Sequence, residues 1–150
     1  MKALIVANWK MNPEKPEDAI HLLEEAQRGV VDSENVQIVI CPPFPYIALL
    51  DVVKDQSWKM GGQNCFWEQE GAFTGEVSAT MLKNLGCEYV IVGHSERKKY
   101  LGETLNIARK KLEAAIQSQL RPIICVENLE ELQEILKDAD KNIASFLIVV

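Results

Sequence analysis

The stretch Tyr89-Val90-Ile91-Val92-Gly93 is apolar and largely β-branched, and it leads directly into His94-Ser95-Glu96-Arg97. The first part predicts a buried strand, so an imidazole, a hydroxyl and a carboxylate follow at its carboxyl end. The start of the chain has the same form, because Ala3-Leu4-Ile5-Val6-Ala7 is followed by Asn8-Trp9-Lys10-Met11-Asn12. If both strands lie in one parallel sheet, their polar residues converge on one rim, where ligands bind in such sheets. The converging residues are Asn8, Lys10, His94 and Glu96.

Strand and helix patterns alternate along the chain, which indicates a parallel sheet covered by helices. The predicted strands are Leu4–Ala7, Val36–Ile40, Lys59–Gln63, Tyr89–Gly93, Pro122–Val126 and Phe146–Val150. Helical spacing between them is marked by Ala19–Ala26, Ile47–Lys54, Met81–Leu85 (with Ser78 as N-cap and Gly86 as C-terminal stop), Leu105–Ile116 and Leu129–Ala139. The spacing of the strands along the chain is typical of a (β/α)8 barrel of about 250 residues. Residues 1–150 therefore predict one partial barrel domain of five βα units and a sixth strand.

The third predicted strand has the weakest strand propensity, because it contains the pair Gly61-Gly62. Paired glycines are more plausible where neighbouring backbone or side chains crowd against the strand. We expect such crowding here.

Composition and charge indicate a globular protein that does not bind nucleic acid. The 150 residues are 47% hydrophobic and 25% charged, and the net charge is −6. Lys98-Lys99 and Lys110-Lys111 are isolated basic pairs beside acidic residues, so we expect them on solvated helix faces rather than against a phosphate backbone.

The cysteines and the apolar runs point to the cytoplasm. Cys41, Cys65, Cys87 and Cys125 form no C-x-x-C pair, and three of them adjoin strand segments, which suits buried thiols rather than disulfides or a metal site. The apolar run after Met1-Lys2 is too short for a signal peptide, and no segment reaches the ~20 apolar residues of a membrane span.

Several long motifs, in order along the chain, resemble triosephosphate isomerases. Asn8-Trp9-Lys10-Met11-Asn12 resembles the first-strand motif of the family, and Gly71–Ala79 resembles its third loop. The run from Cys87 to Arg97 resembles the fourth strand and the start of its loop, and Pro122–Val126 resembles the fifth strand. The resemblance implies a TIM barrel and the interconversion of glyceraldehyde 3-phosphate and dihydroxyacetone phosphate, a step of glycolysis and gluconeogenesis. It implies no cofactor and no metal.

The resemblance also implies roles for the residues at the rim. His94 would be the electrophile at the carbonyl oxygen, acting as neutral imidazole at a helix N-terminus, as is known for this family. Lys10 would supply positive charge near the substrate, and Asn8 would be a donor that holds Lys10 and the substrate oxygens. For Glu96, two interpretations stay open: it pairs with the lysine or orients the site, or it is an acid that interacts with the helix dipole. Thr74 would sit at the tip of a loop that inserts into the partner subunit of a homodimer; a surface loop without a partner is the alternative.

Two departures from the family pattern affect the functional expectation. Glu127 follows Val126 directly, where the family usually has an intervening glycine, so that loop is shortened. The sequence also ends within the expected sixth strand, whereas the catalytic glutamate and most of the phosphate site of the family lie beyond it. We therefore expect the 150-residue chain to be essentially inactive alone.

Two other interpretations remain. A second polypeptide could supply the later strands and the base, as in a split enzyme. Alternatively, the chain could be a non-catalytic open α/β module that binds a phosphorylated ligand or a protein. The bare apolar stretch Phe146–Val150 argues against such a module, because it would leave a sticky sheet edge.

Overall fold

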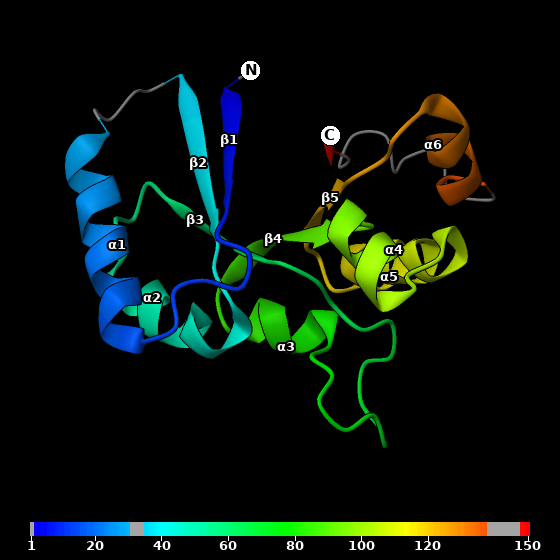
Figure 1. The fold of residues 1–150 in the computed structure, drawn as a ribbon, viewed down its shortest axis with the longest axis horizontal. Helices are drawn as coiled ribbons and strands as arrows, with labels where there is room; N and C mark the ends of the chain where they lie inside the picture. The colour runs from blue at the N-terminus through cyan, green and yellow to red at the C-terminus, as the bar shows by residue number, and fades with distance from the viewer. Residues whose placement is uncertain (1, 31–34, 138–147) are drawn as a thin grey trace.

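The computed structural model describes residues 2–30, 35–137 and 148–150, and in them six parallel strands form one curved sheet (Figure 1). The strand order follows the chain order, β1-β2-β3-β4-β5-β6. The strands are β1 (Ala3–Asn8), β2 (Val36–Cys41), β3 (Lys59–Gly62), β4 (Cys87–Val92), β5 (Arg121–Ile124) and β6 (Ile148–Val149). Among the described residues β1 and β6 are the outer strands, so the sheet is a half-barrel that agrees with the predicted fold class.

Helices follow the strands and cover the convex side of the sheet (Figure 1). They are α1 (Pro16–Gly29), α2 (Ile47–Val53) after a short 3-10 turn η1 (Phe44–Tyr46), α3 (Ala79–Asn84), α4 (Ser95–Leu101), α5 (Leu105–Gln117) and α6 (Leu129–Ile135). The Ser78 side chain accepts a hydrogen bond from the backbone N–H of Met81, so the predicted N-cap of α3 is confirmed. Gly86, the predicted stop, has a φ of 87°.

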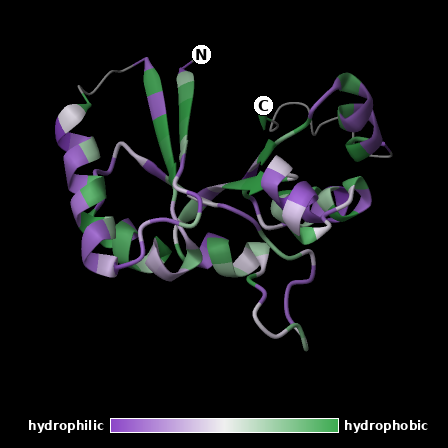
Figure 2. Ribbon diagram, viewed as in Figure 1, coloured by the Kyte–Doolittle hydropathy of each residue, from purple (hydrophilic) through white to green (hydrophobic). Residues whose placement is uncertain are grey.

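The core has two parts because successive residues of a strand point to opposite faces. Ile40 and Met60 lie in the larger cluster, which includes Leu23 of α1 and Leu112 of α5. A smaller cluster lies on the concave face and consists of Val39, Cys41, Tyr89, Ile91 and Ile123. The coloured ribbon shows apolar residues along the strands and polar residues along one side of α1 (Figure 2). This two-sided burial explains why the strand sequences lack polar alternation.

The crowding expected around the two glycines of β3 is confirmed. A Cβ atom added at Gly61 would lie 2.6 Å from Sγ of Cys41, and one added at Gly62 would lie 2.6 Å from Cδ1 of Leu82. The register between β3 and β4 also shifts at Met60/Gly61. A larger residue at either position would therefore force a neighbouring side chain to move.

Two sequence predictions differ from the structure. Lys111 is 3% exposed rather than on a solvated helix face, because it shares the inner side of α5 with Ala108, Leu112 and Ala115. The strand ends move by one or two residues, and Phe146, Leu147 and Ala139 of the predicted last elements lie outside the described residues.

A large apolar hollow lies beside the first two strands, on their helix-facing side. It has a volume of about 680 Å³ and is lined by, among others, Ile5, Ala7, Trp9, Val30, Ile38 and Trp58. Ile5 is 53% exposed there. The polar residues Asn8, Lys10, His94 and Glu96 are not among the residues that line this hollow.

Candidate functional site

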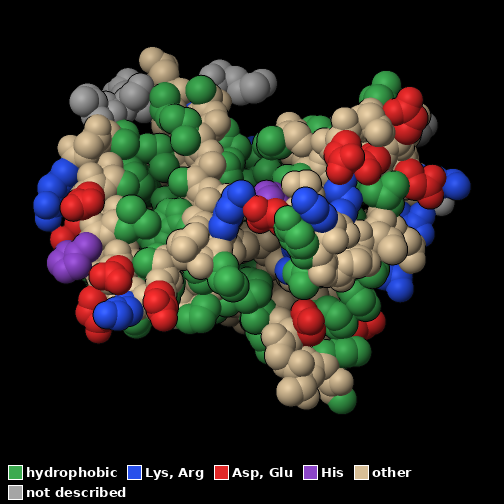
Figure 3. Space-filling view, viewed as in Figure 1, with side chains coloured by type: hydrophobic (Ala, Val, Ile, Leu, Met, Phe, Trp, Pro, Cys, Tyr) green, Lys and Arg blue, Asp and Glu red, His purple; other side chains and the backbone are tan. Residues whose placement is uncertain are grey.

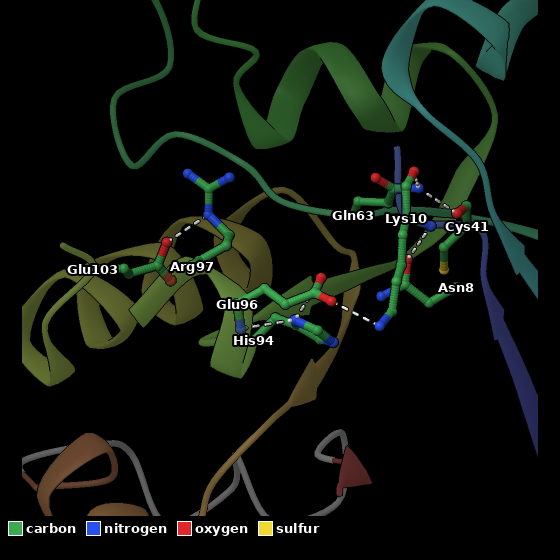
Figure 4. Close-up of polar contacts among 8 residues, drawn as sticks. All are labelled: Asn8, Lys10, Cys41, Gln63, His94, Glu96, Arg97 and Glu103. Atoms are coloured by element: carbon green, nitrogen blue, oxygen red, sulfur yellow. Dashed lines mark hydrogen bonds and ion pairs between the residues drawn. The ribbon is translucent and has the colours of Figure 1, made fainter. Parts of the chain in front are cut away.

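The carboxyl ends of β1 and β4 bring three of the predicted polar residues together (Figure 4). Lys10 follows the end of β1, and its Nζ lies 2.7 Å from Oε1 of Glu96. His94 follows β4, and its Nδ1 lies 3.5 Å from Oε2 of Glu96. In the space-filling view a histidine, an acidic and a basic side chain adjoin near the centre of the visible face (Figure 3). A cation and an imidazole thus lie beside the same carboxylate.

The backbone at Lys10 is held in an unusual conformation. Its φ is 56°, in the left-handed region that non-glycine residues seldom adopt. The backbone N–H of Lys10 donates to Oδ1 of Asn8 at 3.0 Å, which closes a local turn. The side-chain oxygen of Asn8 thus fixes the backbone of Lys10 as an acceptor. The role of Asn8 as a donor to substrate oxygens stays a prediction.

Gln63, which follows β3, fixes the other side of the same residue. Its Nε2 donates to the carbonyl oxygens of Lys10 and Cys41, both at 2.8 Å. One amide group therefore ties the residue after β1 to the end of β2 and to the end of β3. The sequence analysis assigned Gln63 to a strand end and gave it no role.

His94 is the N-cap of α4. Its Nδ1 accepts a hydrogen bond from the backbone N–H of Glu96 at 3.3 Å. An Nδ1 atom that accepts carries no proton, so a neutral ring in this position carries its proton on Nε2. The contact of Nδ1 with Oε2 of Glu96 would be an ion pair only with a proton on Nδ1, which would displace the capping bond. A ring that accepts the capping bond has no proton on Nδ1, so the contact with Oε2 is a close approach and not an ion pair.

Glu96 is held in its ionised form by its neighbours. The hydrogen bond from Lys10 is the largest cause and lowers the pKa of the Glu96 carboxyl; desolvation opposes it, and the positive charge of Lys10 lowers the pKa further. Glu96 also lies in the first turn of α4, where an acid is favoured by the helix dipole. The two interpretations left open by the sequence are thus compatible: Glu96 pairs with Lys10, and it also lies at the N-terminus of α4.

A hollow of about 330 Å³ adjoins His94. It is lined by His94, Ser95, Lys98, Cys125, Val126, Glu127 and Val150. Lys98 contacts Oε2 of Glu131 at 2.7 Å and Oε1 of Glu127 at 3.6 Å, so the residue of the shortened loop lies at the hollow's edge. The hollow opens between the ends of β4, β5 and β6.

Thr74 lies apart from this cluster. It belongs to the segment between β3 and α3, which extends away from the rest of the chain (Figure 1). Thr74 and its neighbours Gly71–Glu76 are exposed.

The sequence analysis missed a buried polar group behind His94. Asn64, Glu103 and Lys111 are 5%, 6% and 3% exposed, and Arg97 contacts Glu103. A usable signal was present, because Lys111 falls in the apolar stripe of α5 with Ala108, Leu112 and Ala115. A lysine in such a stripe needs a buried partner.

In the described part of the chain no group of three or more His, Cys, Asp or Glu side chains is placed to hold a metal ion. Within the same residues, none of the helices has the length and apolar character needed to cross a membrane.

The fold and the rim cluster define a (β/α)-barrel protein with its polar residues at the carboxyl ends of the strands. Comparisons with known proteins narrow this class. The model of the family described as triosephosphate isomerase matches residues 3–145, and the chain belongs to that family. The resemblance seen in the sequence is thereby confirmed.

Relatives with the same name agree over most of this chain. The triosephosphate isomerase of Dictyoglomus turgidum is 44% identical over 137 residues, which are 89% of this chain and 54% of the relative. That of Moorella thermoacetica is 45% identical over 134 residues, 87% of this chain and 52% of the relative. That of Endomicrobium trichonymphae is 39% identical over 148 residues, which are 98% of this chain and 56% of the relative. The chain spans about half the length of the curated relatives that it matches.

Proposed function

We propose that Asn8, Lys10, His94 and Glu96 form the electrophilic half of a triosephosphate isomerase site, which interconverts glyceraldehyde 3-phosphate and dihydroxyacetone phosphate. The observation that carries the proposal is the convergence of three side chains at one rim: Nζ of Lys10 lies 2.7 Å from the Glu96 carboxylate, and the His94 ring, whose Nδ1 accepts from the Glu96 N–H, lies beside it. Family membership supports the substrate, a phosphorylated triose.

The reaction moves a proton between the two carbons that do not carry the phosphate. A base removes the proton from one carbon and the neighbouring carbonyl oxygen becomes the oxyanion of an enediolate. The hydroxyl proton passes from one oxygen to the other, and the base returns its proton to the second carbon. Donors that face the developing oxyanion lower the barrier. With Nδ1 used as the cap acceptor, the Nε2–H of neutral His94 is the donor to that oxygen. The Lys10 ammonium supplies positive charge for the oxyanion and the phosphate.

Glu96 is a poor candidate for the base. Its pKa is lowered by the hydrogen bond from Lys10, and a lowered pKa weakens a carboxylate as a proton acceptor. We therefore infer that the base comes from a segment following the sixth strand, as the family resemblance implies. The hollow beside His94 supports this, because it reaches Val150 at the end of β6.

The test joins residues 1–150 to the remaining part of the Dictyoglomus turgidum relative and measures isomerase turnover. We expect turnover from this chimera and none from the 150-residue chain alone, since a base alone contributes about 10²–10⁴-fold. His94→Gln should lower kcat by about 10²–10³, the cost of losing one oxyanion donor.

His21 provides the matched control, because it is the other histidine, lies on α1 and has a side chain that is 75% exposed. His21→Gln should leave kcat unchanged. Equal turnover from the His94→Gln and unsubstituted chimeras would refute the assignment. The split-enzyme alternative is tested by supplying the same C-terminal part as a separate polypeptide. Isomerase activity that stays at background in this mixture would count against that alternative.

We also propose that the whole protein is a homodimer in which the loop around Thr74 contacts the second subunit. The exposure of Gly71–Glu76 supports this, as does Phe73, an aromatic residue that is 42% exposed there. Thr74→Arg in the chimera should favour the monomer in analytical ultracentrifugation. An unchanged dimer would contradict the assignment of this loop.

A cytoplasmic location is proposed on the basis of the thiols. Cys41, Cys65, Cys87 and Cys125 are all free, and three of them are buried. Free thiols are usual in a reducing compartment. Fractionation of cells that express the protein would test the location.

A further inference from the structure

A buried charged group lies behind His94, and the proposed chemistry does not use it. Oε2 of Glu103 accepts hydrogen bonds from Nε of Arg97 at 2.7 Å and from Nζ of Lys111 at 2.5 Å. Lys111 also donates to Oδ1 of Asn64 at 2.7 Å. Burial opposes ionisation of Glu103, but the two cations outweigh it and lower its pKa. Glu103 is therefore a buried carboxylate anion.

The second oxygen of Glu103 is bonded to the backbone next to His94. Oε1 accepts a hydrogen bond from the N–H of Gly93 at 3.2 Å. The N–H of Glu103 itself donates to the carbonyl oxygen of Arg97 at 3.2 Å. Glu103 thus contacts the chain on both sides of His94: Gly93, which follows β4, and Arg97 of α4, whose contact with Glu103 is drawn in Figure 4.

The direction of the His94 ring depends on this clamped segment. Gly93 has a φ of 73°, which turns the chain from the strand into the helix. A small rotation there would move the ring away from the N–H of Glu96, which the ring accepts at a distance of 3.3 Å. That hydrogen bond determines which nitrogen of a neutral ring carries the proton.

We propose that Glu103 is a positioning residue for His94: by fixing the N–H of Gly93 and the side chain of Arg97, it holds the His94 ring with Nδ1 on the α4 amide and Nε2–H toward the rim. The significance for catalysis rests on the proposed function, whereas the effect on the ring does not. A general contribution to stability is a weaker reason for this group, because buried ion pairs can often be replaced by apolar residues without loss. A hydrogen bond to one particular backbone N–H requires an acceptor.

The test observes the imidazole nitrogens of the 150-residue chain, labelled with ¹⁵N-histidine, by long-range ¹H–¹⁵N NMR. The chain has two histidines, so His21 is an internal reference. In the unsubstituted chain we expect His94 to show one tautomer, with the proton on Nε2, and His21 to show an average of both. Glu103→Gln keeps the shape of the side chain but presents an NH₂ group either to Gly93 N–H or to Arg97 and Lys111. The population of the His94 tautomer with its proton on Nδ1 should then rise severalfold. The ¹⁵N chemical shifts of His94 should move toward those of His21.

Two control variants separate positioning from stability. Leu50→Ala removes a fully buried side chain of α2 and destabilises the chain without touching Glu103. Lys111→Gln removes one cation while Glu103 still accepts from Gly93. Both should keep the His94 tautomer of the unsubstituted chain. A tautomer shift in Leu50→Ala as large as that in Glu103→Gln would overturn the proposal.

A measurement on the unsubstituted chain keeps the proposal testable even where Glu103→Gln does not fold. Hydrogen exchange should show the Gly93 amide protected at least tenfold more than the amide of Gly75, which lies in the exposed loop. An unprotected Gly93 amide, an unchanged His94 tautomer in folded Glu103→Gln, or a mixed tautomer in the unsubstituted chain would each overturn the proposal. These results are independent of turnover: an inactive chimera with a responsive His94 would refute the proposed function and leave this inference intact.

Discussion

The ammonium of Lys10 lies 2.7 Å from the carboxylate of Glu96, although Lys10 follows β1 and Glu96 lies in α4, beyond the fourth strand. Two strands, β2 and β3, lie between them in the sheet. The contact therefore reports on the curvature of the half-barrel as well as on the local charges. Its disruption should be visible in the titration of Glu96.

The first prediction concerns that titration. The pKa of Glu96 should lie below the value of about 4.3 for a free glutamate, because Lys10 stabilises its anion. Lys10→Met should raise it toward that value. Side-chain ¹³C NMR during an acid titration measures the pKa of Glu96 in the unsubstituted chain and in Lys10→Met. Lys59→Met removes a separate ion pair, with Glu88, and should leave Glu96 unchanged; an ordinary pKa in the unsubstituted chain would contradict the ion pair.

The second prediction concerns the buried pair of Glu103 and Lys111. Lys111→Met should lower the free energy of unfolding by about 3–5 kcal/mol, because it removes one partner of a buried charge pair. Glu103→Leu combined with Lys111→Met should cost less than the sum of the two single changes, since neither charge is then left unpaired. Urea denaturation at neutral pH measures the free energy of unfolding of the unsubstituted chain, the two single variants and the double variant. Simple additivity would show that the two residues do not interact.

The third prediction is the pH dependence of the same pair. Folding lowers the pKa of Glu103, so its ionised form stabilises the fold above the ordinary pKa near 4.3. This contribution is lost as the pH falls through the lowered pKa. Between about pH 5 and pH 2 the free energy of unfolding should therefore fall more steeply in the unsubstituted chain than in Glu103→Gln. Parallel curves would contradict the direction of the shift.

The fourth prediction compares two glycines with left-handed backbone. Gly93 and Gly102 have φ values of 73° and 66°. A Cβ at Gly93 would lie 3.2 Å from the carbonyl oxygen of Cys125, whereas one at Gly102 would have no neighbour within 4 Å. Gly102→Ala should cost about 1–2 kcal/mol for the conformation alone. Gly93→Ala should cost about 1–3 kcal/mol more, because the neighbouring strand end must also move; equal melting temperatures would refute the crowding.

The fifth prediction concerns thiol reactivity. Burial raises the pKa of Cys65 and of Cys87 to about 12 and raises that of Cys41 further. Cys125 is only partly buried, and its pKa is also raised. At pH 8 a thiol reagent should modify Cys125 first, and the other three at least a thousandfold more slowly than in urea. Mass spectrometry of peptides from partly modified protein checks this order.

Most of the fold could be predicted from the sequence, because each strand is a short apolar run and each helix has a regular stripe. The bounds of β4 differ from the prediction and are Cys87–Val92. The pairing of β4 with β3 and β5 sets where the strand begins and ends, and the composition of a single strand does not encode that pairing. The rim residues were found because they follow predicted strands directly. The roles proposed for them remain predictions.

The buried group behind His94 was not found, for a physical reason. Glu103 follows a glycine in a connection between two helices, and its charged partners Arg97 and Lys111 lie 6 and 8 positions away along the chain. Asn64, which accepts from Lys111, lies 47 positions from that lysine. Periodicity describes one element at a time, whereas this cluster arises where three elements meet. Lys111 was therefore assigned to solvent on its charge alone.

The polar cluster at the rim is formed entirely by residues 8–96, between the first strand and the fourth helix. The lysine, glutamate and histidine of this cluster consequently need none of the later strands for their mutual contacts. Their arrangement does not depend on which carboxyl-terminal strands follow. Substitutions that tune this cluster and substitutions in the later strands can therefore be selected separately.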